Sequence, residues 1–364
     1  MKKNIVYMDI MKALGIIAVV IGHSGAPNKF FYSYHMALFF FISGYFYDEE
    51  YSYDILKLVK RRIKTLYLPF VGYGLGFLLL HNIFCYLNLY KSKATFQGES
   101  IIIPYTFKEF IKSFIDILTF GRTEPLLAAT WFIISLFTVN ILFCIISYIS
   151  KKVEKKQELV RILIIVIIFV IGNLLSYNGI TLPREINTSC TAILLFYSGF
   201  MFKKYESKIK INSLVAILFF VVSVLISSKY DIINVGENIY PSIFIFLVSS
   251  ASGIYWNIFL SKFISENLKN KKILINIGKN SLHIMTLHFL CFKLVNLFII
   301  KFYDLPNHEL ASLMGIKGYK YYWIVNCVIG IFIPISLYYT YNIILSKNFY
   351  KKVIKRLTID STMK

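Results

Sequence analysis

The chain alternates between long runs of apolar residues and short polar segments. Each run is about 14 to 25 residues long, and about 20 apolar residues are needed for an α-helix to cross the hydrocarbon core of a bilayer. The runs lie at about 6–25, 33–47, 66–90, 126–150, 160–177, 190–203, 212–228, 239–260, 279–302 and 321–345. This pattern predicts an all-α polytopic membrane protein, a bundle of about ten transmembrane helices.

Lys and Arg gather in every second segment between these runs. They lie at Lys2 and Lys3 and within 57–64, 151–161, 203–210, 262–272 and 347–364. If the N-terminus is cytoplasmic, all of these segments lie inside and hold about 26 of the 40 Lys and Arg residues, which agrees with the positive-inside rule. The runs 33–47 and 190–203 are short enough to be re-entrant, but removing either would reverse the sidedness of everything after it. We therefore predict ten spans with both termini in the cytoplasm, the C-terminus as a basic tail at about 346–364.

The composition supports a membrane domain. Hydrophobic residues make up 57% of the 364-residue chain and charged residues 16%, whereas soluble domains carry roughly a quarter charged residues. A net charge of +21 is also found in nucleic-acid binders, but here the basic residues lie at the ends of apolar runs, where they set topology and contact anionic lipid. We therefore expect the lipid bilayer, and not a nucleic acid, as a partner.

The chain is expected to form one domain, residues 1–364, because no internal repeat, low-complexity tract or soluble catalytic domain is visible. Its start resembles a secretory signal peptide, but Asp9 and Lys12 interrupt the apolar stretch, so we interpret the first run as a retained helix. The five cysteines are odd in number and widely spaced, and therefore predict neither a disulfide framework nor a metal site.

The first apolar run carries three ionisable residues, Asp9, Lys12 and His23. Such groups are costly inside a membrane, so they usually face a cavity or a partner. Lys12 and His23 are 11 residues apart, which places them within about 20° of one helix face and about 16 Å apart, and Asp9 joins that face one turn earlier. The hypothesis is a polar stripe that lines a path for a charged or thioester substrate. The alternative is an interfacial Asp9–Lys12 ion pair with His23 among the outer headgroups.

Two further segments carry candidate site residues. His35 opens the second run, where a contact with the wet headgroup region is the alternative. Arg61 and Arg62 lie in the basic group at 57–64. This group either marks topology and contacts lipid, or forms an anion pocket for phosphates such as those of coenzyme A, because a guanidinium group pairs with phosphate in a bidentate way.

The segment LINIGKNSLHIMTLHFL spans the start of the ninth run and contains the polar residues Asn280, Ser281 and His288. Ser281 and His288 are seven positions apart and share a helix face. They are separated by about two turns, too far for a hydrogen bond within one helix, so a Ser-His nucleophilic pair is disfavoured. We expect His288 to face residues of other helices, with a hydrogen-bonded core histidine as the alternative.

Together these residues resemble the acyltransferase-3 family of integral membrane acyltransferases. A basic residue, ten intervening residues and a histidine, here Lys12 and His23, resemble its first-helix signature. YHMALFFFISGYFY resembles its second-helix signature, AATWFI around Trp131 its central Trp-Phe element, and IGKNSLHIMTLH its late Gly-x-x-Ser…His element. The resemblance runs from the first apolar run to the ninth and covers most of the chain.

The resemblance implies transfer of an acyl group, usually acetyl, from cytoplasmic acyl-CoA to a hydroxyl of a cell-envelope or exported polysaccharide. It implies a multi-pass protein of the cell membrane, that is, the inner or cytoplasmic membrane. The polysaccharide O-acetyltransferase branch, which includes the fucose 4-O-acetylase-like proteins, is the most similar. Two departures are Lys12, where Arg is commoner and would bind in a bidentate way, and the absence of a recognisable extra acyl-carrying or racemase domain.

On this interpretation His23 is the general base, because imidazole titrates at about pH 6.5 and can take the proton of a sugar hydroxyl. Asp9 holds Lys12 in place, and His35 and His288 orient the acceptor or the thioester. No metal is expected. The co-substrate is acetyl-CoA or another acyl-CoA, and the residues expected to contact it are Lys12, Arg61, Arg62, Trp131, Asn280 and Ser281.

Two other functions also place charges inside a membrane. A transporter or flippase for a glycan or a lipid-linked precursor would line its path with polar residues, but many transporters contain internal repeats, and none is visible here. A non-catalytic assembly or sensor protein is disfavoured by the histidines in and beside the apolar runs. Consumption of acyl-CoA separates the first function from both alternatives.

Overall fold

The computed structural model describes residues 5–91, 102–231, 233–316 and 321–345. Each of the ten apolar runs forms a helix close to its predicted bounds, and the described residues contain no β-strand beyond one isolated bridge between Asn234 and Ile239. The ten helices are α1 (Val6–His23), α3 (His35–Tyr45), α5 (Leu68–Tyr86), α7 (Trp131–Lys151), α8 (Gln157–Tyr177), α9 (Ile186–Tyr205), α10 (Ser213–Lys229), α11 (Ile243–Asn267), α13 (Ser281–Phe302) and α14 (Tyr322–Leu345). The prediction of an all-α polytopic membrane protein is confirmed.

Seven helical segments of the described residues are long and apolar enough to cross a membrane. They are Val6–His23, Ile55–Tyr86, Pro125–Lys151, Gln157–Tyr177, Ile243–Asn267, Ser281–Phe302 and Tyr322–Ile344. Helix α3 has 11 residues and α10 has 17, whereas α9 has 20 residues but begins with the polar residues Asn187, Thr188 and Ser189. A crossing by these three helices, and therefore the total of ten, stays a prediction.

Shorter elements connect these helices. They are α2 (Lys29–Tyr32), η1 (Glu49–Ser52), α4 (Ile55–Arg62), η2 (Ile63–Tyr67), α6 (Phe107–Leu118), η3 (Pro125–Thr130), η4 (Glu154–Lys156), η5 (Glu206–Lys208), α12 (Lys272–Lys279) and η6 (Asn307–Ala311). Helix α4 continues through η2, a turn of π-helix, into α5. Single π-helical turns inside helices are frequent at functional sites, so η2 is a candidate segment for substrate contacts.

Helix α1 lies among the other helices. It packs against α3, α11, α12, α13 and α14, and most of its residues are buried. Its approach to α12 is close, because a Cβ at Gly278 would lie 1.9 Å from the carbonyl oxygen of Asp9. The ionisable residues of α1 are therefore surrounded by protein, the environment in which such groups are tolerated within a membrane.

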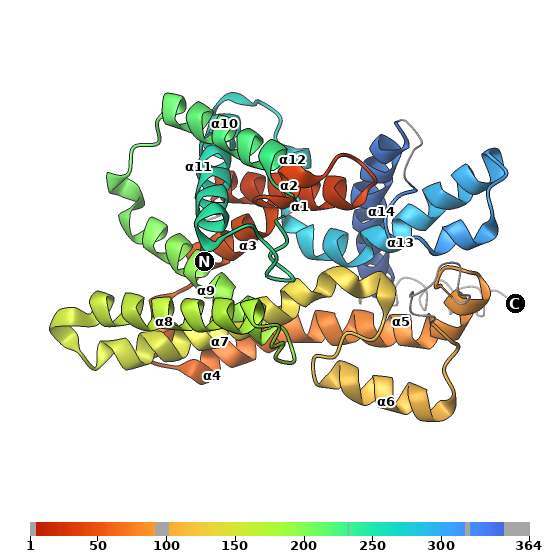
Figure 1. The fold of residues 1–364 in the computed structure, drawn as a ribbon, viewed down its shortest axis with the longest axis horizontal. Coiled ribbons are helices and arrows are strands. Elements are labelled where there is room, and N and C mark those ends of the chain that lie inside the picture. Colours follow the sequence, from red (N-terminus) through yellow and green to blue (C-terminus); the bar gives the residue numbers. More distant parts are fainter. Residues whose placement is uncertain (1–4, 92–101, 232, 317–320, 346–364) are drawn as a thin grey trace, which may run out of the picture.

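Two layers of helices meet where α3 packs on α9. Figure 1 shows α5, α7 and α8 in one layer and α10, α11, α13 and α14 in the other. At the contact, a Cβ at Gly44 would lie 1.8 Å from the Phe196 carbonyl oxygen, and one at Gly199 would lie 1.9 Å from that of Phe41. Small residues allow membrane helices to approach this closely, so these two glycines determine how the layers join.

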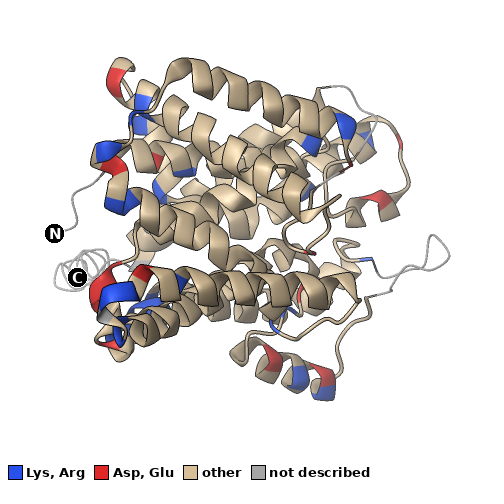
Figure 2. Cartoon of the chain, turned by 60° about the vertical axis from the view of Figure 1, so that its left-hand side comes forward, with Lys and Arg blue, Asp and Glu red and all other residues tan. Residues whose placement is uncertain are grey.

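Polar contacts between connecting segments agree with the predicted alternation of sides. On the predicted outer side they are Lys29–Asp231 and Arg184–Asp116. On the predicted inner side they are Lys151–Glu49, Lys204–Glu158 and Lys262–Glu206. Figure 2 shows the charged residues mainly near the ends of the helices, with long uncharged stretches between them. The side that faces the cytoplasm stays a prediction, and Lys2, Lys3 and the predicted tail at 346–364 lie outside the described residues.

Candidate active site

One face of α1 lines an internal cavity of about 420 Å³. Lys12, Ile16, Val19 and His23 recur at the spacing of successive helical turns, and all four line the cavity. Lys12 lies toward the predicted cytoplasmic end of α1 and His23 toward the outer end. The cavity therefore follows α1 over about 16 Å, the rise of eleven helical residues.

Lys12 is held at the inner end of the cavity by two contacts. Its Nζ lies 3.1 Å from Asp9 Oδ1 and 4.7 Å from the centre of the Phe46 ring. The Asp9 side chain is 10% exposed and the Lys12 side chain 26%. The ammonium group is thus paired and positioned without being enclosed, which leaves it able to contact a ligand in the cavity.

His23 and His288 form a pair at the outer end. His23 Nδ1 lies 2.9 Å from His288 Nε2, and His288 Nδ1 lies 3.1 Å from the carbonyl oxygen of Ile284. A carbonyl oxygen only accepts, so we assign the proton of neutral His288 to Nδ1. His288 Nε2 then accepts from His23 Nδ1–H, and the lone pair of His23 lies on Nε2. This arrangement prepares His23 Nε2 to accept a proton.

Aromatic groups surround the remainder of the outer end. His35 is 3% exposed and lines the cavity, and its Nδ1 donates to the Phe31 carbonyl oxygen at 2.6 Å. The Tyr32 ring contacts both histidines, with its centre 5.7 Å from that of His23 and 5.1 Å from that of His35. Trp131 also lines the cavity. Aromatic rings therefore line the cavity at the end where His23 lies.

The expected donor-binding residues divide into two groups. Lys12, Trp131 and Ser281 line the cavity, together with Thr65 and Leu66 of η2. Three others do not line it: the exposed Arg61 contacts the Tyr51 hydroxyl, Arg62 follows it in α4, and Asn280 donates to the Asn276 carbonyl oxygen at 2.8 Å. A donor that contacts both arginines and Lys12 must therefore pass η2.

A polar cluster around Glu206, which the sequence did not predict, joins the start of α1 to the ends of α3 and α9. Glu206 accepts hydrogen bonds from the hydroxyls of Tyr7 at 2.5 Å and Tyr45 at 2.6 Å, and it pairs with Lys262 at 2.9 Å. Partial burial raises the pKa of Glu206, but the hydrogen bonds from Tyr45, Tyr7 and Lys262 outweigh it and leave this pKa below its ordinary value. These residues lie far apart in the chain, so no sequence spacing connects them.

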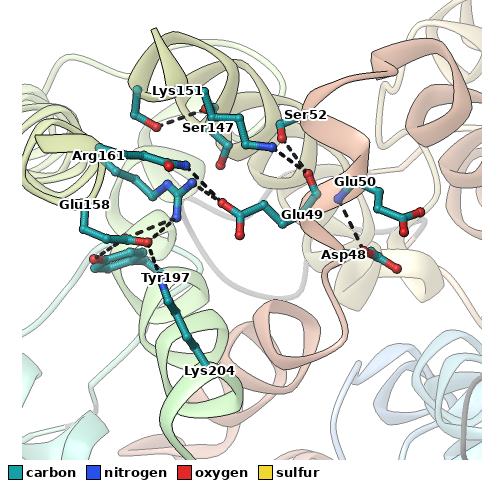
Figure 3. Close-up of polar contacts among 12 residues, drawn as sticks. Asp48, Glu49, Glu50, Ser52, Ser147, Lys151, Glu158, Arg161, Tyr197 and Lys204 are labelled. Carbon is teal, nitrogen blue, oxygen red and sulfur yellow. Dashed lines mark hydrogen bonds and ion pairs between the residues drawn. The ribbon is translucent and has the colours of Figure 1, made fainter. Parts of the chain in front are cut away.

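A second missed network surrounds Arg161, which Figure 3 shows between two acidic side chains. Arg161 is fully buried, with Nη2 2.5 Å from Glu49 Oε1 and Nη1 3.0 Å from Glu158 Oε1. Lys204 also contacts Glu158 at 2.7 Å. The network ties η1 to the start of α8 and the end of α9. In the sequence Arg161 lies at the edge of an apolar run and belongs to the basic group that predicts topology.

Two further buried residues, His81 and Lys293, could have been selected as candidates from the sequence. His81 lies inside the run at 66–90, and its Nδ1 is 3.0 Å from Glu124 Oε2, which also accepts from the Tyr90 hydroxyl at 2.8 Å. Lys293 lies inside the run at 279–302 and donates to the carbonyl oxygens of Leu310 and Ser312 at 2.8 and 2.6 Å. Both are ionisable residues in an apolar run, the criterion that selected His23 and His288.

The described residues contain no group of three or more His, Cys, Asp or Glu side chains placed to hold a metal ion. Comparison with curated proteins and with solved structures finds no significant match. The family model described as "Acyltransferase domain", that of acyltransferase 3, matches residues 5–341, nearly the whole chain. The matched range includes every residue that lines the cavity, whose two ends are marked by Lys12 and His23. The chain therefore belongs to the acyltransferase-3 family of membrane acyltransferases.

Proposed function

We propose that the protein transfers an acyl group, acetyl as the first candidate, from cytoplasmic acyl-CoA to a hydroxyl of a cell-envelope or exported polysaccharide. The observation that carries the proposal is that Lys12 and His23 line opposite ends of the same cavity. A donor that enters from the cytoplasm reaches Lys12 first, whereas an exported acceptor reaches His23 first. The fucose 4-O-acetylase-like branch is the part of the family to which we assign this activity.

In this mechanism His23 acts as the general base. Its Nε2 takes the proton from the acceptor hydroxyl while the hydroxyl oxygen attacks the thioester carbonyl carbon. The new ester C–O bond forms, the C–S bond breaks, and the proton passes from His23 to the sulfur of the leaving coenzyme A. His288 keeps the His23 lone pair on Nε2 through their 2.9 Å contact and stabilises the imidazolium while it exists.

The inner residues serve the donor. Lys12, held by Asp9 at 3.1 Å, supplies a positive charge for the pantetheine carbonyl groups of the donor, because the thioester itself must reach His23, about 16 Å further along α1. Arg61 and Arg62 lie outside the cavity and serve as the contacts for the phosphates on the predicted inner surface, where a charged group costs less than inside the bundle. At the other end of the cavity Trp131 contacts the acyl end of the donor, and His35 orients the acceptor or the thioester.

Radiolabelled acetyl-CoA and the purified protein in lipid nanodiscs, with surface polysaccharide from its own host cells, test the proposal. We expect label in the polysaccharide and release of free coenzyme A, and we expect His23→Ala to lower kcat by about 10²- to 10⁴-fold. Mass analysis of glycans from cells with and without the gene should show the matching acyl mass. Full activity of a membrane-inserted His23→Ala protein would overturn the assignment of the base, and glycan movement without acylation would favour a flippase.

A further inference from the structure

A second chamber of about 450 Å³ opens beside the main cavity. Its volume lies within the range of small-molecule sites in proteins. It is lined by residues of two connecting segments that meet on the predicted outer side: Phe120, Arg122, Thr123, Glu124, Pro125 and Arg184, with Glu185 beside them. No step of the mechanism above uses this chamber.

Arg122 and Ala128 line both the chamber and the main cavity. Arg122 Nη2 lies 2.7 Å from Glu185 Oε1, and its Nη1 donates to the Ala128 carbonyl oxygen at 3.3 Å. Its side chain remains 40% exposed. The guanidinium group therefore stands at the boundary between the two spaces, and a ligand in the chamber lies next to the cavity where the reaction is proposed to occur.

The charges of the chamber balance. Its lining contains two arginines, Arg122 and Arg184, and two glutamates, Glu124 and Glu185. Glu124 is bound by His81 and Tyr90, and Arg184 Nη2 donates to Thr119 Oγ1 at 2.8 Å. A phosphorylated ligand such as the donor would require an excess of positive charge. A balanced set of donors and acceptors instead suits a neutral ligand with many hydroxyl groups, each of which both donates and accepts.

One polar group of the chamber has no hydrogen-bond partner among the described residues, and the partly buried Glu185 carboxylate is only partly stabilised by its ion pair with Arg122. Thr123 Oγ1 is buried and makes no hydrogen bond within the described part of the chain. Burial raises the pKa of Glu185, and the Arg122 guanidinium lowers it only in part. A buried hydroxyl without a partner costs free energy, and a hydroxyl of a bound ligand would remove that cost.

The backbone of the chamber is also unusual. Phe120, Arg184 and Glu185 have φ values of 63°, 58° and 58°, in the left-handed region that residues with a Cβ rarely adopt. Such strained residues cluster at ligand sites, where the surrounding structure holds them in place. Three of them line one chamber, which points to a binding role for its shape.

We infer that this chamber is the acceptor subsite and that it binds an uncharged sugar unit of the polysaccharide through Arg122, Thr123 and Glu185. The inference rests on the proposed function. The sugar next to the acylated one occupies the chamber, while the hydroxyl to be acylated reaches past Arg122 toward His23. The chamber thus determines which glycan is accepted and contributes nothing to the binding of acyl-CoA.

The sharpest variant is Thr123→Val, which keeps the shape of the side chain and removes a hydroxyl that has no partner in the described protein. We expect an unchanged or higher Tm, because the variant removes a buried hydroxyl to which no described residue hydrogen-bonds. We also expect an unchanged KM for acetyl-CoA and a KM for host surface polysaccharide at least about tenfold higher. Arg122→Gln should raise the same KM by a similar factor or more. Lys29→Gln serves as the matched control, because it removes an exposed outer cation paired with Asp231 that lines neither space.

The outcomes separate the two proposals. If the wild-type protein transfers no label to polysaccharide, the proposed function fails, whatever the chamber does. If the wild type is active and Thr123→Val and Arg122→Gln keep the wild-type KM for polysaccharide, the acceptor subsite is overturned. A selective change of the KM for acetyl-CoA in either variant would also overturn it, because that result assigns the chamber to the donor.

Discussion

His23 Nδ1 lies 2.9 Å from Nε2 of His288, a residue 265 positions later in the chain. The pair joins α1 to α13, and His288 is fully buried behind His23 while His23 lines the cavity. His288 Nδ1 in turn donates to the Ile284 carbonyl oxygen. This contact determines which ring nitrogen carries the proton in His288 and, through the contact between the rings, in His23. Under the proposed function the two histidines have different roles, because His23 faces the cavity where the substrates would bind and His288 holds the His23 ring from behind.

Replacing His288 with Leu should lower kcat at least about tenfold, because the Nδ1–H of His23 loses its acceptor and the ring is free to change tautomer. The KM for acetyl-CoA should stay near the wild-type value, since His288 lies behind the cavity wall. His288→Gln should recover part of kcat, because its side-chain oxygen can accept the same hydrogen bond. Equal kcat values for the Leu and Gln variants in the nanodisc assay would contradict a positioning role.

The Lys12–Asp9 pair should govern the donor. Lys12→Met removes the positive charge at the inner end of the cavity, and we expect the KM for acetyl-CoA to rise about tenfold or more. Lys12→Arg keeps the charge and should recover most of the affinity. The KM for polysaccharide should not change in either variant, and a change in that constant alone would show that Lys12 serves the acceptor.

Two glycine-to-alanine substitutions should distinguish steric overlap at the contact between the layers from the general effect of alanine on helix stability. Gly44→Ala places a Cβ 1.8 Å from the Phe196 carbonyl oxygen, which forces α3 and α9 apart and should cost several kcal/mol or prevent folding. Gly72→Ala in α5 meets no atom within 4 Å and should be neutral or stabilise the protein by about 0.5–1 kcal/mol. Yield and Tm in detergent compare the two. A Gly44→Ala protein as stable as the wild type would show that the close approach is not required.

Arg161→Met should destabilise the protein without altering KM for either substrate. The arginine is fully buried and binds Glu49 and Glu158, which are 38% and 33% exposed, so loss of the pair should cost about 1–3 kcal/mol. Lys204→Met, at an exposed pair with Glu158, should cost less than about 1 kcal/mol. Thermal unfolding measures both. If the two variants lose the same stability, the burial of Arg161 does not increase the contribution of its ion pairs to the free energy of unfolding.

The Glu206 cluster predicts a pH dependence of stability. Because the folded-state pKa of Glu206 lies below its unfolded value of about 4.3, its contribution is present above that value and is lost as pH falls through the folded pKa. Between about pH 5 and pH 3 the wild type should therefore lose more Tm than Glu206→Gln. Asp231→Asn removes an exposed carboxylate paired with Lys29, so it should reduce the loss of Tm over this pH range less than Glu206→Gln does. Parallel curves for the wild type and Glu206→Gln would contradict the prediction.

The helices could be read from the sequence because apolar length is a local property. Every run from 6–25 to 321–345 forms a helix at nearly the expected bounds. The cavity face of α1 was equally accessible, since the rotation of 100° per residue alone places Lys12 and His23 on one side. The same arithmetic separates Ser281 from His288 by about two turns, and in the structure His288 contacts His23 of another helix.

What the sequence did not contain was which helices meet. The contacts His23–His288, Glu206–Tyr7 and His81–Glu124 join positions far apart in the chain, and no periodicity encodes such a distance. Arg161 illustrates the same limit. In the sequence, an arginine that forms a buried ion pair looks the same as one that marks topology at the membrane interface. Only the positions of Glu49 and Glu158 in the structure distinguish the two cases.

By itself, then, the sequence determined the helices, their alternation of charge, and the polar face of α1, because these depend on residues within about one helix of each other. Only the tertiary structure decided that His23 faces His288, that Arg61 and Arg62 stay outside the cavity, and that Arg122 stands between two chambers. The reason is physical: helix formation follows from local hydrogen bonds and apolar length, whereas the shape of a site follows from how closely helices pack. That packing depends on small residues such as Gly44 and Gly199, which fit backbones together that lie far apart in the chain.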